Sequence, residues 1–233
     1  MNKNELKYRH ELKYVISVAQ IPLLKSRISN LMQPDPHSGE DGVYNIRSLY
    51  FDDYSNRCFY ENENGTDPRE KFRIRIYNHS SERITLECKR KEHGKTRKSS
   101  CLLSKEQAEQ LIYGNPLPLA ASSPPLLKKF TMEMLTRRLR PVVIVEYERI
   151  PFVYKNGNVR VTFDTQIASS SDITNFFSDT LGKRPITPAG QHLMEVKFDE
   201  YLPDFIYRNL NLAVLQQTAY SKYYLCRKYS LRK

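Results

Sequence analysis

The 233-residue sequence lacks the short motifs by which many nucleotide-binding and hydrolytic enzymes are recognised. It contains no GxxxxGK[ST] loop, no GxGxxG after a strand pattern, no HExxH and no GxSxG. The five histidines are scattered along the chain, a pattern more typical of structural residues than of metal ligands. Any chemistry on phosphates therefore has to proceed without a glycine-rich phosphate loop.

Cysteine is sparse, and long apolar runs are missing. Cys58, Cys88, Cys101 and Cys226 form no CxxC pair, so neither a zinc site nor a disulfide framework is indicated, and we expect a reducing, cytoplasmic setting. The longest apolar run, 142–145, is too short to cross a bilayer, and the first residues lack the apolar core of a signal peptide. We expect no membrane segment.

Positive charge is abundant. There are 37 Lys and Arg against 26 Asp and Glu, a net charge of +11 that is spread along the chain. This balance favours an anionic partner, which is a nucleic acid, a phosphorylated metabolite or a membrane surface. The length suits one domain over residues 1–233 with a core of its own.

Two neighbouring segments, Phe72–Tyr77 and Ile84–Lys91, alternate with period two and predict a β-hairpin. One face of each segment is apolar and the other is charged. The charged faces carry Arg73, Arg75, Thr85, Glu87, Lys89 and Lys91. A row of cations with one carboxylate among them is thus displayed on one side of the hairpin.

The same division between an apolar and a charged face recurs in two further predicted strands. Arg9, Glu11 and Lys13 share a face of the strand over 9–16, and Glu195 and Lys197 share a face of the strand over 193–198. The other strands that we predict cover 44–53, 96–103, 142–153 and 159–168, the last two being joined by an Asn-Gly turn.

Helices are predicted from caps and spacing. Ser17 with Gln20 and Ser104 with Gln107 have the capping-box spacing, so we expect one helix from Ser17 to about Pro34 and another that ends at Gly114. The remaining helices are expected within 55–70 and over 126–139, 203–211 and 216–229.

The alternating pattern does not decide which face of the strands is buried. If the charged faces lie inside a closed barrel, the cations repel one another and lose water unless an anion is bound between them. If these faces lie outside, they form an ordinary solvated surface over a sandwich core. Both arrangements are compatible with the spacing.

Six segments in this order resemble the catalytic domain of the VTC (vacuolar transporter chaperone) family, in its stand-alone bacterial form, within the triphosphate tunnel metalloenzymes. The resemblance covers residues 7 to about 229. The segments are Arg9–Tyr14, Leu49–Asp53, Arg73–Arg75, Glu87–Lys89, Leu193–Lys197 and Ser221–Tyr223.

The resemblance implies an α+β fold: an antiparallel β-barrel of about eight strands that forms a tunnel, with flanking helices and a C-terminal helix. It also implies a set of phosphate-binding catalytic residues and further substrate contacts. The first set is Lys13, Arg73, Arg75, Lys89, Arg149, Arg160 and Lys222, and the second is Arg9, Lys98, Tyr147, Lys197 and Ser221.

By the same resemblance, Glu195 holds a divalent metal, Mn²⁺ or Mg²⁺, with Glu11 as a second candidate. Hydrolases of the superfamily carry ExExK in the first strand, whereas this chain has His10-Glu11-Leu12-Lys13. Only one of the two glutamates is retained. This departure favours a polymerase over a hydrolase.

The function implied is an ATP-dependent polyphosphate polymerase, a metal-dependent phosphotransferase whose partners are ATP and polyphosphate. The alternatives are a hydrolase of triphosphates or nucleotides and a non-catalytic polyphosphate-binding module. Sequence-specific nucleic-acid binding is not expected, because the basic residues lie on strands and no recognition helix is present. Passage of a product across a membrane requires association with a separate membrane protein.

Overall fold

The computed structural model describes residues 8–231. Its main feature is one antiparallel sheet with the strand order β1-β10-β8-β7-β3-β4-β5-β6. The bounds of these strands are β1 His10–Ser17, β3 Tyr44–Asp52, β4 Arg69–Tyr77, β5 Ser80–Glu92, β6 Lys95–Leu103, β7 Arg140–Tyr154, β8 Val159–Ser170 and β10 Gln191–Phe198. Two short strands, β2 (Gln33–Pro34) and β9 (Arg184–Pro185), add to β7 and β8.

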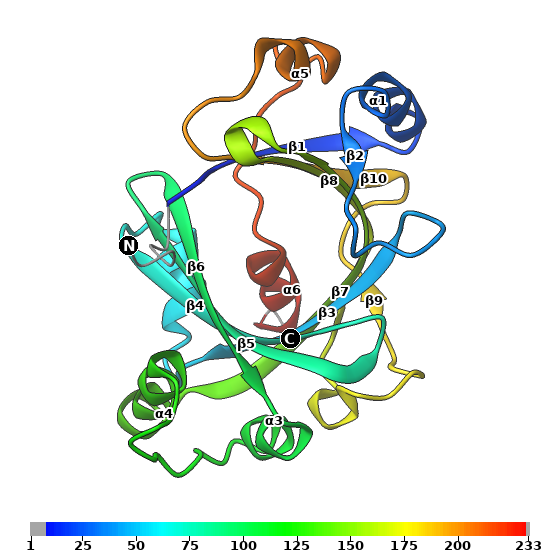
Figure 1. Ribbon diagram of the computed structural model, residues 1–233. Helices are drawn as coiled ribbons and strands as arrows, with labels where there is room; N and C mark the ends of the chain where they lie inside the picture. Colours follow the sequence, from blue (N-terminus) through cyan, green and yellow to red (C-terminus); the bar gives the residue numbers. More distant parts are fainter. Residues whose placement is uncertain (1–7, 232–233) are drawn as a thin grey trace.

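The sheet curls until its two outermost strands meet. The backbone of Arg9, just before β1, and that of Thr96 in β6 exchange two hydrogen bonds of 2.8 and 2.9 Å. In Figure 1 the strands form a ring when seen along the axis of the curl. The expected antiparallel barrel of eight strands with flanking helices is therefore confirmed.

Six α-helices accompany the sheet in the described residues, and α1, α3, α4 and α5 are drawn outside the ring in Figure 1. Helix α6 is drawn within the ring, and α2 packs against it through Phe59 and Tyr224. Their bounds are α1 Gln20–Ile28, α2 Arg57–Glu63, α3 Lys105–Ile112, α4 Pro125–Arg137, α5 Asp204–Asn209 and α6 Lys222–Leu231.

The outward faces of the strands are apolar, and helices cover them. One cluster joins β4 and β5 to α3 and α4, where Phe130 packs between Phe51 and Phe72 with ring centroids 4.9 and 5.2 Å apart. A second cluster joins β1, β8 and β10 to α1 and α5. Because the outward faces form the cores, the charged faces of the same strands point into the ring. Of the two arrangements compatible with the alternating pattern, the structure therefore has the barrel with charged faces inside.

A third cluster fills part of the interior. Val143, Val145 and Leu193 point inward and pack against Tyr223 and Cys226 of α6. Tyr223 also donates a hydrogen bond to Asp52, which accepts two more from the backbone N–H groups of α2. Helix α6 is thereby fixed inside the ring, with its first residue, Lys222, directed at the charged wall.

Three predicted boundaries were wrong. Helix α1 begins at Gln20, and its N-cap is Ala19. The side-chain oxygen of Gln20 accepts a hydrogen bond from the Ser17 N–H, but no side-chain hydrogen bond caps the helix, so the predicted capping box is only half formed. It ends at Ile28, and residues 33 and 34 pair with β7 instead. The last helix begins only at Lys222, because residues 217 and 218 bond to the edge of β1.

The second capping box and its glycine stop are confirmed. Ser104 and Gln107 bond reciprocally at the start of α3, and Gly114 has a φ of +80° just after the helix. None of the helices within residues 8–231 has the length and hydropathy to span a bilayer.

The core packing predicts a large loss of stability on truncation of Phe130, whose side chain is fully buried. Replacing it with alanine leaves a cavity between Phe51 and Phe72, so Phe130→Ala should lower the free energy of unfolding by about 3–5 kcal/mol. Leu135→Ala on the same helix is the control, since Leu135 is 58% exposed, and should change it by less than about 0.5 kcal/mol. Urea unfolding measures both, and equal losses would contradict this packing.

Candidate active site

Nine basic residues on the inner face of the barrel pair with carboxylates. Strand register brings many of them together, since Lys13 lies opposite Glu195, Glu11 opposite Lys197, and Arg73 opposite Glu87. The paired basic residues are Lys13, Arg73, Arg75, Lys89, Lys98, Arg149, Arg160, Lys197 and Lys222, and the carboxylates are Glu11, Glu87, Asp164 and Glu195, with Asp35 at the rim as the partner of Arg160. The surface is therefore strongly cationic even after internal pairing.

Glu195 on β10 is the most heavily paired of the carboxylates. Its Oε2 lies 2.8 Å from Nζ of Lys197 and 3.4 Å from Arg149, and its Oε1 lies 2.8 Å from Nζ of Lys222 and 3.8 Å from Lys13. Burial alone would raise the pKa of this carboxyl, but Lys197, Lys222 and Lys13 hold it well below its usual range. Glu195 is ionised and neutralised locally.

Asp164 on β8 forms the second centre. Arg149 holds it with two parallel hydrogen bonds of 2.6 and 2.7 Å, and Nζ of Lys222 lies 2.5 Å from its Oδ2. Tyr147 lies beside this group, with its ring under Lys222 and its hydroxyl 3.4 Å from the Arg75 guanidinium. The C-terminal helix and strands β7, β8 and β10 thus meet at one charge cluster.

Glu87 on β5 is the third centre. It lies 2.6 Å from Arg73, 3.7 Å from Arg75 and 2.9 Å from Lys98. Neutral hydroxyl groups also orient the two guanidinium groups, because Arg73 donates a hydrogen bond to the Tyr50 hydroxyl and Arg75 donates one to the Ser48 hydroxyl. The two guanidinium groups are therefore pre-oriented along one strand.

Glu11 on β1 links the two sides of the barrel. Its Oε2 accepts a hydrogen bond of 2.6 Å from Lys89 on β5, and its Oε1 lies 3.3 Å from Nζ of Lys13. Burial opposes ionisation of Glu11, yet Lys89 and Lys13 hold its pKa well below its usual range. The Thr96 hydroxyl on β6 also donates to Oε2 at 3.3 Å, so the edge strands β1 and β6 are joined by side chains as well as by backbone.

The other candidates lie at the ends of the barrel. Arg9 pairs with Asp199 at 2.9 Å, and Arg160 pairs with Asp35 at 2.6 Å and donates to the Tyr44 hydroxyl. Ser221 precedes α6, where its hydroxyl accepts a hydrogen bond from Lys71. All twelve basic or polar candidates and both glutamates therefore face the interior or its rims, and their roles stay predictions.

Sequence reasoning assigned no site role to several residues of this surface. Glu87 and Asp164 lie on the charged faces, but the resemblance assigned a site role to neither. Lys71 was also missed, although it continues the alternation of Arg73 and Arg75 by one step towards the start of β4. Extending the period-two pattern by two residues would have found it.

Glu11 and Glu195 are the two carboxylates that the sequence predicts as metal ligands. The Lys13 ammonium lies between them, 3.3 and 3.8 Å from their oxygens. Within residues 8–231 no three Asp, Glu, His or Cys side chains group into a metal site of their own. Such a pair suits Mg²⁺ or Mn²⁺ that takes its remaining ligands from phosphate and water.

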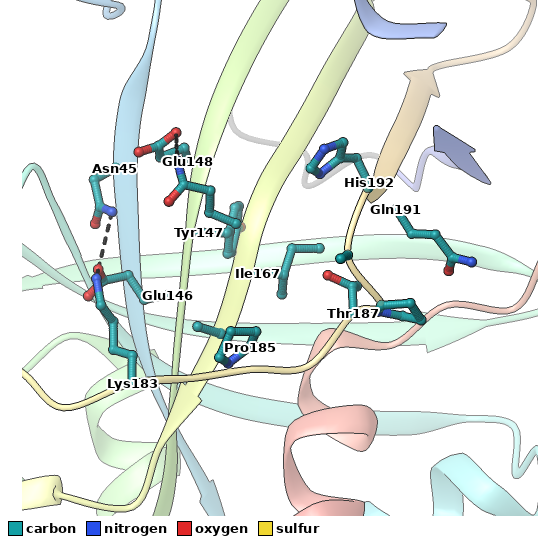
Figure 2. A pocket seen from close by; sticks show the side chains of 15 residues that line it. Asn45, Glu146, Tyr147, Glu148, Ile167, Lys183, Pro185, Thr187, Gln191 and His192 are labelled. Carbon is teal, nitrogen blue, oxygen red and sulfur yellow. Dashed lines mark hydrogen bonds and ion pairs between the residues drawn. The ribbon is translucent and has the colours of Figure 1, made fainter. Parts of the chain in front are cut away.

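A separate pocket of about 370 Å³ lies on the outer side of β7 and β8 (Figure 2). Asn45, Glu146, Lys183 and His192 are among the side chains around it, and Tyr147 reaches it at the bulge in β7. Tyr147 is the one predicted site residue in this lining. The pocket is thus distinct from the charged wall.

The fold encloses a strongly cationic wall, and comparison of the sequence with known families gives the family. The chain belongs to the VTC domain family, whose model matches residues 8–231. No curated protein sequence matches it.

Solved structures share the fold at low sequence identity. A candidate adenylate cyclase from Bacillus halodurans is 15% identical over 92% of this chain and 94% of its own, with a TM-score of 0.54. HpAC1, a candidate adenylyl cyclase from Hippeastrum reported to have a dominant triphosphatase activity, is 12% identical over 96% of both chains, with a TM-score of 0.52. The chain has the triphosphate tunnel fold.

Lys71 predicts a pH dependence of stability. Burial and the neighbouring Arg69 lower the pKa of Lys71 from 10.5 to about 7, so between these values the unfolded chain binds a proton that the folded chain does not. The free energy of unfolding of the ligand-free protein should therefore rise with pH from 7 to 9, by up to about 1.4 kcal/mol per pH unit for this group.

Lys71→Gln should reduce this slope in urea unfolding at constant ionic strength, whereas Lys105→Gln, on the outer helix α3, should leave it unchanged. Lys89, whose pKa is lowered to about 8 by burial, adds to the slope in the same direction. An unaltered slope in Lys71→Gln would contradict the lowered pKa.

Proposed function

We propose that this protein is an ATP-dependent polyphosphate polymerase, which transfers the γ-phosphate of ATP to the end of a growing polyphosphate chain. The observation that carries the proposal is the cationic inner wall, on which basic residues outnumber carboxylates on one enclosed surface. A row of linked phosphates supplies the negative charge that this wall lacks. Membership of the VTC domain family supports the same reading.

In the proposed reaction, an oxygen of the terminal phosphate of the chain bonds to the γ-phosphorus of ATP. The bond between the γ-phosphorus and the β–γ bridging oxygen breaks, and ADP leaves with that electron pair. The attacking oxygen is already anionic, so no protein group has to remove a proton from it.

The low pKa values of the inner carboxylates favour transfer to a phosphate acceptor over hydrolysis by water. Attack by water calls for a general base whose pKa lies near the working pH. Burial alone would raise the pKa values of Glu87 and Glu195. Nearby cations outweigh burial, chiefly Arg73 at Glu87 and Lys197 at Glu195, and hold both pKa values well below the usual range. These carboxylates are weak bases, whereas a phosphate acceptor needs none.

Within residues 8–231 none of the four cysteines is an activated thiol for covalent catalysis. Cys58, Cys88, Cys101 and Cys226 are free thiols, and burial raises the pKa of each. Catalysis in this proposal therefore rests on positioning and on electrostatic stabilisation of the transferred group.

We assign the roles as follows. Arg73, Arg75 and Arg149 contact phosphate oxygens through paired N–H groups, and Lys13, Lys89 and Lys222 act as point charges. Glu195, with Glu11, would hold Mn²⁺ or Mg²⁺, which when bound neutralises charge on the phosphates. The remaining proposed phosphate and substrate contacts are Arg9, Lys98, Tyr147, Arg160, Lys197 and Ser221.

The alternative is a triphosphate hydrolase on the same wall. It is favoured by the fold shared with the Hippeastrum protein that is reported to have triphosphatase activity. Free cysteines are consistent with a cytoplasmic setting, where ATP is available, and a separate membrane protein would take up any exported product.

Purified protein with ATP and Mn²⁺ should produce long-chain polyphosphate with one ADP per phosphate added, followed by ³¹P NMR. Arg75→Ala should lower kcat/KM by about 10²–10³, because a pre-oriented guanidinium is lost from the transferred group. Lys105→Gln on the outer wall serves as the control. Free phosphate without chains would establish the hydrolase, and binding without turnover would leave only a polyanion-binding module.

A further inference from the structure

Charge pairing along the inner wall is uneven. Each of the nine basic residues described above has a carboxylate within 4.0 Å. Arg69, Lys71 and Lys91 lie on the same inward faces of β4 and β5, yet within residues 8–231 none of them has an acidic partner at that distance. Strand register places Arg69 opposite Lys91 and Lys71 opposite Lys89, so the unpaired cations are neighbours.

The groups that orient these cations are neutral. Nζ of Lys71 donates to Oδ1 of Asn62 at 2.7 Å and to Oγ of Ser221 at 3.3 Å, and it lies 4.9 Å from the ring centroid of Tyr223. Arg69 donates to the backbone carbonyl of Thr66. Neutral oxygens satisfy the N–H donors without cancelling the positive charge.

The uncompensated charge has an energetic consequence. Burial, followed by the repulsion of Arg69, lowers the pKa of both Lys71 and Lys91. Glu11 and Asp67 exert an opposing influence on Lys91, but both lie beyond ion-pairing distance. Like charges held together at a partly buried site are costly, and a bound anion removes this cost.

The position of the cluster distinguishes it from the centre of the wall. Strand β4 begins at Arg69, so the cluster lies at one end of the barrel. Arg75 is six residues further along β4 than Arg69 and four further than Lys71, which at about 3.3 Å per residue corresponds to about 20 Å and about 13 Å. One triphosphate at Arg75 is too short to reach Arg69 and its cross-strand neighbour Lys91, whereas a longer chain of phosphates can.

We propose that Arg69, Lys71 and Lys91 form a separate anion subsite, which holds phosphate groups of a long polyphosphate chain away from the reacting phosphates. This inference rests on the proposed function, which supplies the polyphosphate. The subsite makes affinity depend on chain length, because only the longer chains reach it.

Calorimetric titration without ATP tests the subsite with two probes, tripolyphosphate and size-fractionated long-chain polyphosphate. Lys91→Gln and Lys71→Gln should each weaken binding of the long chain by about tenfold, the value of one charge-assisted hydrogen bond. Lys91→Gln should bind tripolyphosphate as the wild type does, whereas Lys71 lies opposite Lys89 and bonds to Ser221, so its loss can also affect the shorter probe. Lys105→Gln, outside the barrel, is the matched control and should keep both affinities.

Lys91→Gln is included because Lys71 also ties Asn62 to Ser221, so its loss affects local packing as well as charge. Unfolding midpoints confirm that each variant is folded. In Lys91→Gln, equal loss of both probes, or no loss of either, would overturn the subsite while the wild-type affinities still support the proposed function. A wild type that binds neither probe would overturn both.

Discussion

The structure depends on the neutralisation of like charges inside a closed sheet. Glu195 alone is contacted by Lys13, Lys197, Lys222 and Arg149, which come from four different elements. Without carboxylates at these points, cations brought together by strand curvature would repel and lose water without compensation. Four carboxylates spaced around the wall therefore allow the barrel to close while it keeps an excess of positive charge for a ligand.

The rest of the fold follows from this arrangement. Since the inward faces are charged, the outward faces supply the apolar cores, and helices have to cover them. A buried ion pair also lies on the outward side: Arg47 is fully buried, pairs with Glu146 and donates to the backbone carbonyls of Phe176 and Ser178. This pair fixes the long segment after β8 against the sheet, on the side opposite to the charged wall.

The strands and their faces could be predicted because alternation is a local property. The direction of the faces could not, since the same alternation describes a barrel with charged contents and a sandwich with a charged surface. The start of α6 at Lys222 was also beyond local reasoning, because residues 217 and 218 are extended by bonds to β1, a contact distant in sequence.

The same limit applies to the candidate site. Residues inside recognised motifs, such as Arg73 and Glu195, were identified from the resemblance. Glu87 and Asp164 were not assigned a role, because their importance comes from cross-strand partners that only the register reveals. Lys71 could have been predicted from the sequence, because it continues the alternation of Arg73 and Arg75. It was missed because the predicted strand began at Phe72.

We propose that the inner wall binds polyphosphate, and thermal unfolding in the presence of tripolyphosphate tests this most directly. At about 100 times the Kd, binding to the folded state contributes about 2.7 kcal/mol, which for a chain of this size corresponds to a Tm increase of about 5–10 °C. The increase should shrink as NaCl is added. A Tm shift no larger than that given by NaCl alone at equal ionic strength would contradict the account.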